Sequence, residues 1–311
     1  MLSQVKGGKI KKRLIFSFVL FLATSFFFFI QNIWAGSLKE RDEYIKGVLS
    51  KFEESSPAVI PNIKKEAPQK KHTFEGGSEV YHYTYKEPGL MRYKGIWRGF
   101  NFAYTFRGQM PPVAKNGMVK VESRYCWGRV DYDGHLLDEA RTPFFEYNIP
   151  QYMFETRALF GNEFFVSETV SFIPYLGLGY RYLKDNSPGM ERRQHYYYMP
   201  LGLEVIKRLK RNWSIGMQAE LDLFCGGRQI TYRANLGEKH KFRQTDGIGL
   251  RGAFKIQNKT RFVDFNFEPF IRYWHIDDSK LGPPVEGEED LYWFEPKNLT
   301  RELGFKLALV F

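Results

Sequence analysis

The sequence predicts an all-β fold, a closed antiparallel transmembrane β-barrel of about ten strands. Three observations lead to this prediction. From residue 78 onward apolar and polar residues alternate with a period of two, which is typical of strands with two different faces. Most alternating runs have about ten residues or more, the length at which a tilted strand crosses a bilayer. The polar positions hold glycine and charges of both signs, which suit a crowded interior.

The composition is rich in aromatic residues and yet hydrophilic. Of 311 residues, 17% are aromatic and 26% are charged, which excludes a polytopic helical membrane protein and a disordered chain. Cys126 and Cys225 are too few for a disulfide framework or a multi-cysteine zinc site, and we expect them to be unpaired. Part of the net charge of +11 lies between Lys6 and Arg13, and no basic stripe with stacking aromatics follows. We therefore expect no nucleic-acid partner.

The N-terminal residues predict an exported protein. Residues 1–13 are basic, residues 14–30 are uncharged and mostly apolar, and residues 33–36 offer a small-residue cleavage site after Ala35. Residues 1–35 thus have the pattern of a signal peptide. The apolar run is longer than usual, so an uncleaved membrane anchor remains the alternative. Residues 36–77 predict a periplasmic helix and a proline-bearing linker, and residues 78–311 the barrel.

The last alternating segment shows the strand pattern most clearly. Leu303, Phe305 and Leu307 share one parity, while Glu302 and Lys306 share the other. Such alternation also fits a soluble sandwich, but the length of the segments and their terminal aromatics favour a membrane barrel. The predicted strands cover residues 79–86, 96–107, 118–130, 152–161, 169–183, 196–209, 213–226, 247–257, 262–276 and 301–311.

The connections between these strands alternate in length. Residues 162–168, 210–212 and 258–261 form short turns, whereas residues 131–151, 184–195, 227–246 and 277–300 form long loops. Short turns belong to the periplasmic side of such barrels and long loops to the outside. The even count of strands then leaves both termini in the periplasm. Pro88 and Gly89 blur the first hairpin, so eight strands is the alternative.

The inward parity carries equal numbers of cations and anions. Charges in a narrow, partly desolvated interior need partners, so we expect a cross-strand network of ion pairs that plugs the lumen. A lumen that conducts small solutes is the alternative. The expected network consists of Lys120, Glu122, Arg124, Glu155, Arg157, Arg181, Glu204, Glu220, Asp222, Arg251, Lys255, Asp264, Glu268, Arg272, Glu302 and Lys306.

The final strand, which ends in Phe311, resembles the C-terminal signal that the barrel-assembly machinery of Gram-negative bacteria recognises. Together with the signal peptide, it makes the chain similar to outer-membrane β-barrel proteins, a group that includes opacity-type adhesins, omptins and small porins. The predicted topology is most similar to the omptin-like barrel. This resemblance implies a location in the Gram-negative outer membrane, with membrane lipid and the assembly machinery as partners.

The omptin resemblance also implies candidate catalytic residues at the outer rim. Omptins use an aspartate pair on the second outer loop and an Asp–His pair on the fourth to activate water. Here Asp131 and Asp133 stand near the first place, and Glu238 with His240 near the second, with Glu in place of Asp. The pattern is incomplete, and an Asp-x-Asp-Gly segment is also an ordinary turn. We expect no metal and no cofactor.

These observations favour a structural or surface-interaction role, similar to that of an adhesin, in which the outer loops meet an extracellular ligand. An omptin-like surface endoprotease and a narrow pore for small solutes are the two alternatives. The sequence does not identify the ligand, because specificity resides in loops whose conformation no motif determines.

Overall fold

The computed structural model describes residues 71–110, 114–135, 142–186, 190–233, 238–282, 284–285 and 288–311. All of these belong to one compact unit, Ile63–Phe311. The predicted signal peptide, residues 1–35, and the leader up to residue 70 lie outside the described residues. Within the described part of the chain, no helix is both long enough and apolar enough to cross a membrane.

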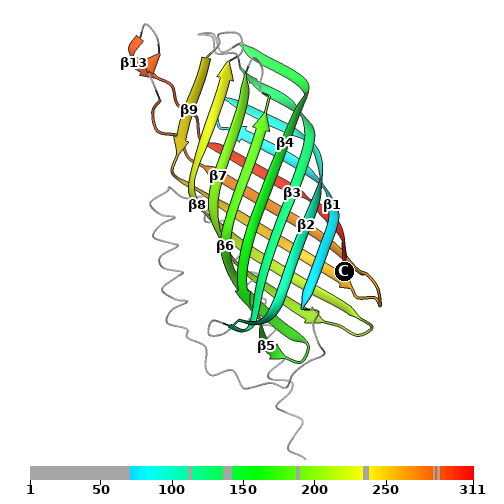
Figure 1. Ribbon diagram of the computed structural model, residues 1–311. Coiled ribbons are helices and arrows are strands. Elements are labelled where there is room, and N and C mark those ends of the chain that lie inside the picture. Colours follow the sequence, from blue (N-terminus) through cyan, green and yellow to red (C-terminus); the bar gives the residue numbers. More distant parts are fainter. Residues whose placement is uncertain are drawn as a thin grey trace, which may run out of the picture. The chain divides into compact units, whose positions relative to one another are not determined.

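Ten strands close into an antiparallel barrel (Figure 1). Each wall strand pairs with the strands on either side of it, and the ring is completed where β1 meets β14 and where β8 meets β10. The wall strands are β1 (His72–Glu87), β2 (Met91–Met110), β3 (Ala114–His135), β4 (Pro143–Asn162), β6 (Val170–Asp185), β7 (Glu191–Arg208), β8 (Trp213–Arg233), β10 (Gly247–Asn258), β11 (Asp264–Ile276) and β14 (Asn298–Val310).

Four shorter strands either extend this wall or form a separate hairpin in one of its connections. β5 (Phe164–Ser167) pairs with β6, and β9 (Glu238–Gln244) continues the sheet beside the end of β8. β12 (Pro284–Val285) and β13 (Glu288–Tyr292) form a separate small hairpin within the connection between β11 and β14. The sequence pattern predicted none of these four strands.

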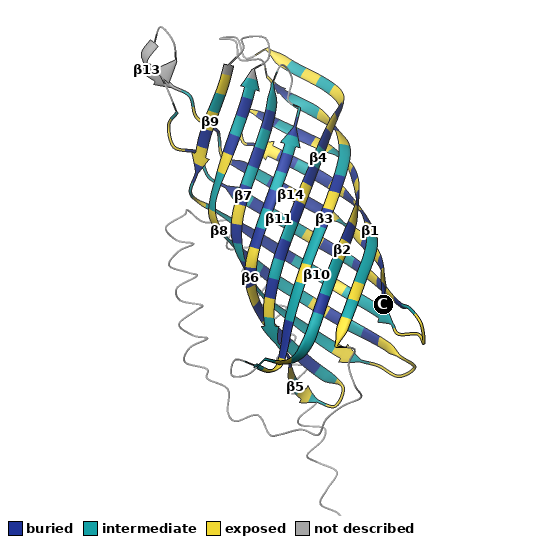
Figure 2. Cartoon of the chain, in the orientation of Figure 1, coloured by how far each residue is buried: buried dark blue, intermediate teal, exposed yellow. Residues whose placement is uncertain are grey.

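The outer surface of the barrel is apolar. Buried and exposed positions alternate along much of the wall, as Figure 2 shows, and most regularly in β1, β6 and β14. The exposed positions include Phe102, Leu178 and Leu303, whose exposed fractions are 65%, 67% and 58%. A continuous apolar surface of this extent requires lipid rather than water around it. A closed antiparallel barrel with such an exterior has the architecture of an integral protein of the Gram-negative outer membrane.

The two ends of the barrel differ in the strands' connections. The β7–β8 and β10–β11 turns are short, and both termini of the barrel lie at the same end, where Phe74 and Phe311 exchange backbone hydrogen bonds of 2.8 and 3.2 Å. This is the periplasmic end by the usual rule for such barrels. The β3–β4, β8–β10 and β11–β14 connections are at the other end, which we call the outer mouth.

The strands reach further than the sequence predicted. β1 begins at His72 rather than at residue 79, so the barrel takes in part of the predicted linker. Most of the predicted loop over residues 131–151 is strand, because β3 runs to His135 and β4 starts at Pro143. The first hairpin, which Pro88 and Gly89 blurred, is a tight turn in which Gly89 has φ 79°. Gly76 and Gly77 interrupt the alternation in β1, and tyrosine stands both at the inward position Tyr132 and at the exposed position Tyr147, so no hydrophobic pattern marks these extensions.

Candidate functional site

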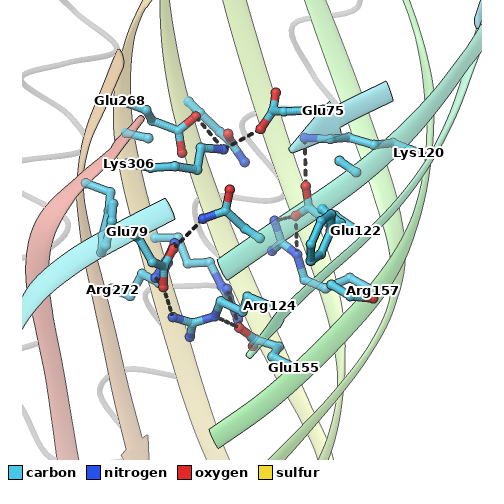
Figure 3. A pocket seen from close by; sticks show the side chains of 18 of the residues that line it. Glu75, Glu79, Lys120, Glu122, Arg124, Glu155, Arg157, Glu268, Arg272 and Lys306 are labelled. Carbon is cyan, nitrogen blue, oxygen red and sulfur yellow. Dashed lines mark hydrogen bonds and ion pairs between the residues drawn. The ribbon is translucent and has the colours of Figure 1, made fainter. Parts of the chain in front are cut away.

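The inner faces of the wall strands meet in the middle of the barrel around Arg124 of β3. Its guanidinium contacts Glu155 of the neighbouring β4 at 2.5 Å, and across the lumen it contacts Glu79 of β1 at 3.0 Å and Glu302 of β14 at 2.8 Å. Figure 3 shows Arg124, Glu155 and Glu79 converging from different strands. Arg272 of β11 pairs with the same Glu79 and Glu302. All these residues lie within the barrel, so each charge has protein partners in place of water.

Arg251 of β10 forms the second centre of this network. It contacts Glu155 at 2.5 Å, Asp222 at 2.6 Å and Glu220 at 3.1 Å. The carboxylates receive further hydrogen bonds from tyrosines: Tyr198 donates to Glu155 at 2.6 Å, and the hydroxyl of Tyr175 donates to Glu220 at 2.7 Å. Hydrogen bonds of this kind satisfy the remaining lone pairs of buried carboxylates.

Lysine pairs occupy the interior nearer the periplasmic end. Lys306 bridges Glu75 at 2.8 Å and Glu268 at 3.2 Å. Lys120 contacts Glu122 at 2.7 Å, and Lys255 contacts Glu204 at 2.8 Å. Arg157 joins this layer to the centre through Glu122 and Glu220.

A cavity of about 70 Å³ lies between these layers and has room for a few water molecules. Its lining includes Glu79, Asn101, Lys120, Arg272 and Lys306. The charged side chains that line it are engaged in the ion pairs described above, so the cavity offers water a polar wall and leaves little unneutralised charge for a ligand.

Fifteen of the sixteen residues predicted for the network take part in it, Arg181 through its bond to Glu302. The exception is Asp264, which accepts a hydrogen bond from the Thr260 backbone at 3.1 Å in the β10–β11 turn region. Arg181 donates to Glu302 at 3.2 Å and lies over the Trp274 ring. Glu75, which pairs with Lys306, and Glu79, which pairs with Arg124 and Arg272, are two further interior carboxylates of β1 that the sequence analysis did not place inside.

Aromatic side chains fill the barrel between this network and the outer mouth. The rings of Tyr83 and Trp97 lie 4.5 Å apart, and those of Tyr198 and Trp274 lie 5.0 Å apart. These side chains are almost completely inaccessible to solvent. The aromatic layer consists of Tyr81, Tyr83, Tyr85, Tyr93, Trp97, Tyr196, Tyr198 and Trp274.

A second ionic group, which sequence reasoning missed, lies above the aromatic layer. Arg192 of β7 contacts Asp185 of β6 at 2.8 Å, Glu295 at 3.3 Å, and Glu87 of β1. We call Glu87, Asp185, Arg192 and Glu295 the outer mouth cluster. Asp185, Arg192 and Glu295 lie in predicted loops, and Glu87 lies directly after a predicted strand, so the pattern gives none of the four an inward parity.

The structure does not bring the candidate catalytic residues together. Val130 and Tyr132 of β3 pack in the interior, so Asp131 and Asp133 between and beyond them point to the outer surface. Asp133 pairs with Arg92 at 2.6 Å, and Asp131 accepts a hydrogen bond from the Asn148 backbone at 3.1 Å. Both carboxylates therefore serve contacts between neighbouring strands.

The histidine of the predicted pair is on another part of the wall. His240 lies on β9, opposite Thr231 of β8, and its ring lies near the rings of Phe242 and Trp293. In the sheet order β9 is separated from β3 by β4, β6, β7 and β8. The side chain of Glu238 lies outside the described residues.

Other sites for chemistry are limited in the described part of the chain. His275 and Asp277 are 3.0 Å apart at the outer end of β11, on the outward parity. No group of three or more His, Cys, Asp and Glu side chains there is arranged to hold a metal ion. Both cysteines are free, and the Cys126 thiol donates a hydrogen bond to Glu79 at 3.1 Å.

Comparison with known proteins finds similarity in structure alone. No protein-family model and no curated protein sequence matches the chain. The outer-membrane protease OmpT of Escherichia coli is similar with a TM-score of 0.49 and 8% identity, over 77% of this chain and 97% of OmpT. Neisserial surface protein A has a TM-score of 0.31 and 10% identity, over 76% of this chain and 95% of that protein. Ail, the attachment invasion locus protein of Yersinia pestis, has a TM-score of 0.28 and 9% identity, over 77% of this chain and 99% of Ail. These similarities concern barrel architecture and assign no activity.

Proposed function

We propose that this chain is a closed-lumen outer-membrane barrel with a structural or surface-interaction role, in which the outer loops bind an extracellular ligand. The observation that carries the proposal is the filling of the interior. Paired charges occupy its periplasmic half and centre, the aromatic layer lies above them, and the outer mouth cluster follows. A barrel filled in this way leaves its outer surface and loops as the parts that can act on other molecules.

Exposed aromatic side chains at the outer end support a binding role. Phe145 and Tyr147 lie on the part of β4 that continues past its ladder with β6, and their exposed fractions are 56% and 71%. Aromatic side chains are enriched in protein interfaces, and tyrosine is among the residue types that most often form binding hot spots there. The β3–β4 hairpin is therefore the part of the outer end that we expect to contact the ligand.

Conductance and cleavage assays distinguish this proposal from its alternatives. Purified protein in a planar bilayer should give no steady current steps, because ions would have to cross the paired charges and the aromatic layer. The same preparation should leave fluorogenic basic peptides intact. Stepwise currents would support the narrow pore, and cleavage that Asp131→Ala or His240→Ala abolishes would support the protease.

The binding role itself is tested with proteoliposomes on arrays of immobilised extracellular proteins and glycans. The double variant F145S/Y147S should bind with an affinity at least about tenfold lower than that of the wild type, since hot-spot aromatics contribute about 2 kcal/mol or more each. Phe262→Ser is the matched control, because Phe262 is 78% exposed but lies in the β10–β11 turn at the periplasmic end. Equal binding by F145S/Y147S and the wild type would contradict the role of this hairpin.

A further inference from the structure

The outer mouth cluster contains more negative charge than its single guanidinium can neutralise. Glu87, Asp185 and Glu295 surround Arg192, and each of these four residues is at most 5% exposed. Full ionisation would leave two uncompensated negative charges in a site with little water. Such sites disfavour the charged form of one of their carboxyl groups.

Glu295 differs from the other members because it belongs to a loop and not to the wall. The β11–β14 loop reaches the mouth through two legs, residues 277–282 and 293–297. The legs are joined by backbone bonds from Ser279 to the Glu295 carbonyl at 2.9 Å and from Gly282 to the Trp293 carbonyl at 2.7 Å. The backbone of Glu295 donates in turn to the Ser279 hydroxyl at 2.8 Å. The side chain of Glu295 is thus the buried anchor of a surface loop.

The titratable groups that face Glu295 come from three wall strands, and they include the hydroxyls of Tyr85 of β1 and Tyr196 of β7. Glu87 of β1 and Asp185 of β6 repel its carboxylate, and Arg192 of β7 attracts it. β8 contributes the neutral Gln229. Burial, with the repulsion by Glu87 added, raises the pKa of Glu295 to about 8, although Arg192 acts in the opposite direction.

We propose that Glu295 is a protonation-controlled latch, which holds the two legs of the β11–β14 loop on the outer mouth when it is neutral and releases them when it is ionised. The proton leaves to the solvent, and the carboxylate follows the loop into water. This inference goes beyond the proposed function and does not depend on what the loops bind.

The direction of the pH effect follows from proton linkage. The pKa of Glu295 is about 8 in the latched loop, against 4.5 for an ordinary glutamate in water. Closure of the latch is therefore coupled to the binding of one proton at pH values between about 4.5 and about 8. The latch is at full strength below about pH 4.5 and weakens as the pH rises to about 8, by up to tenfold in the open-to-closed ratio per pH unit.

Hydrogen exchange of the full-length protein in detergent micelles tests the latch. The amides of Ser279, Gly282 and Glu295, which bond between the legs, are followed by mass spectrometry at pH 5 and pH 8, with correction for the intrinsic exchange rate. We expect their protection to fall at least tenfold at pH 8. In Glu295→Gln the side chain is neutral at both pH values, so the amides should stay protected at both.

Glu168→Gln is the matched control, since it removes an exposed carboxylate from the β5–β6 turn and should keep the wild-type pH response. Heat-modifiability on gels checks that each variant is a folded barrel. Equal wild-type protection at pH 5 and pH 8 would overturn the latch. So would a Glu295→Gln variant that keeps the wild-type pH dependence, or one whose legs are unprotected at pH 5.

Discussion

At the residue scale, Arg124 shows how the interior is held together. Its guanidinium contacts three carboxylates from three strands, Glu79, Glu155 and Glu302, and only 7% of its side chain is exposed. Five N–H donors in a rigid planar group suit such a position better than the single ammonium of lysine. Removal of this group leaves buried carboxylates without a partner, and that loss costs more than the ion pairs themselves contribute.

We expect Arg124→Met to lower the free energy of unfolding by about 3–5 kcal/mol, the usual loss when one partner of a buried ion pair is removed. Guanidinium-induced unfolding in detergent, followed by intrinsic fluorescence, measures the change. Arg98→Met is the control, because Arg98 lies outside the barrel over the Trp127 ring and should cost about 1 kcal/mol or less. Similar losses in both variants would show that Arg124 is not central to the interior.

The alternation of apolar and polar residues predicts the inward direction of some charged side chains and not of others. Apolar residues flank Arg251 and Glu302 on the opposite parity, and this alternation predicts that both side chains point inside. Glu79 was missed because its strand carries tyrosines at the inward positions Tyr81 and Tyr83, with His82 between them on the outside. Tyrosine and histidine fit either face of such a wall, so alternation of hydrophobicity loses its meaning there.

At the element scale, β14 closes the barrel. It pairs with β11 on one side and with β1 on the other, and Phe311 follows it at 52% exposure. The backbone of Phe311 bonds with that of Phe74, whereas its ring points away from the interior. The ring therefore contributes little to the packing of the finished barrel, which fits the predicted part of Phe311 in assembly.

Phe311→Ser should accordingly reduce the fraction of protein that reaches the folded, heat-modifiable form in cells, by severalfold. The barrel that does form should unfold at the wild-type denaturant concentration, because both backbone bonds to Phe74 are kept. Gel mobility of outer-membrane fractions measures the first quantity and denaturant titration the second. A variant with normal yield and lowered stability would make Phe311 a packing residue instead.

The limits of prediction at this scale concern the ends of elements. The number and order of wall strands followed from the alternation, since a bilayer imposes length and parity on each crossing segment. Beyond the lipid this constraint ends. Residues 131–135 and 143–150 therefore form strands that no hydrophobic pattern marks, and β9, β12 and β13 have no signal at all.

At the scale of the whole molecule, side chains fill the interior at several depths. The paired charges, the aromatic layer and the outer mouth cluster follow one another along the barrel, and the loop that carries Glu295 covers only the last of these. Loss of the loop therefore should not open a path for ions.

A variant in which residues 281–293 are replaced by a short Gly-Ser linker should give no steady current steps in planar bilayers, because the aromatic layer and the charge network remain. Retention of heat-modifiability shows that the variant is folded. Stepwise currents from this variant, with none from the wild type, would mean that the loop is the plug and that the interior below it conducts.

The bond between Arg124 and Glu302 joins residues 178 positions apart in the chain. The centre of the molecule consequently stays incomplete until its last strand arrives. Up to that moment an open, curved sheet presents unneutralised guanidinium and carboxylate groups, which hydrocarbon would reject. We therefore expect the unclosed sheet to stay in a hydrated environment during biogenesis, and to enter lipid only as its two ends meet.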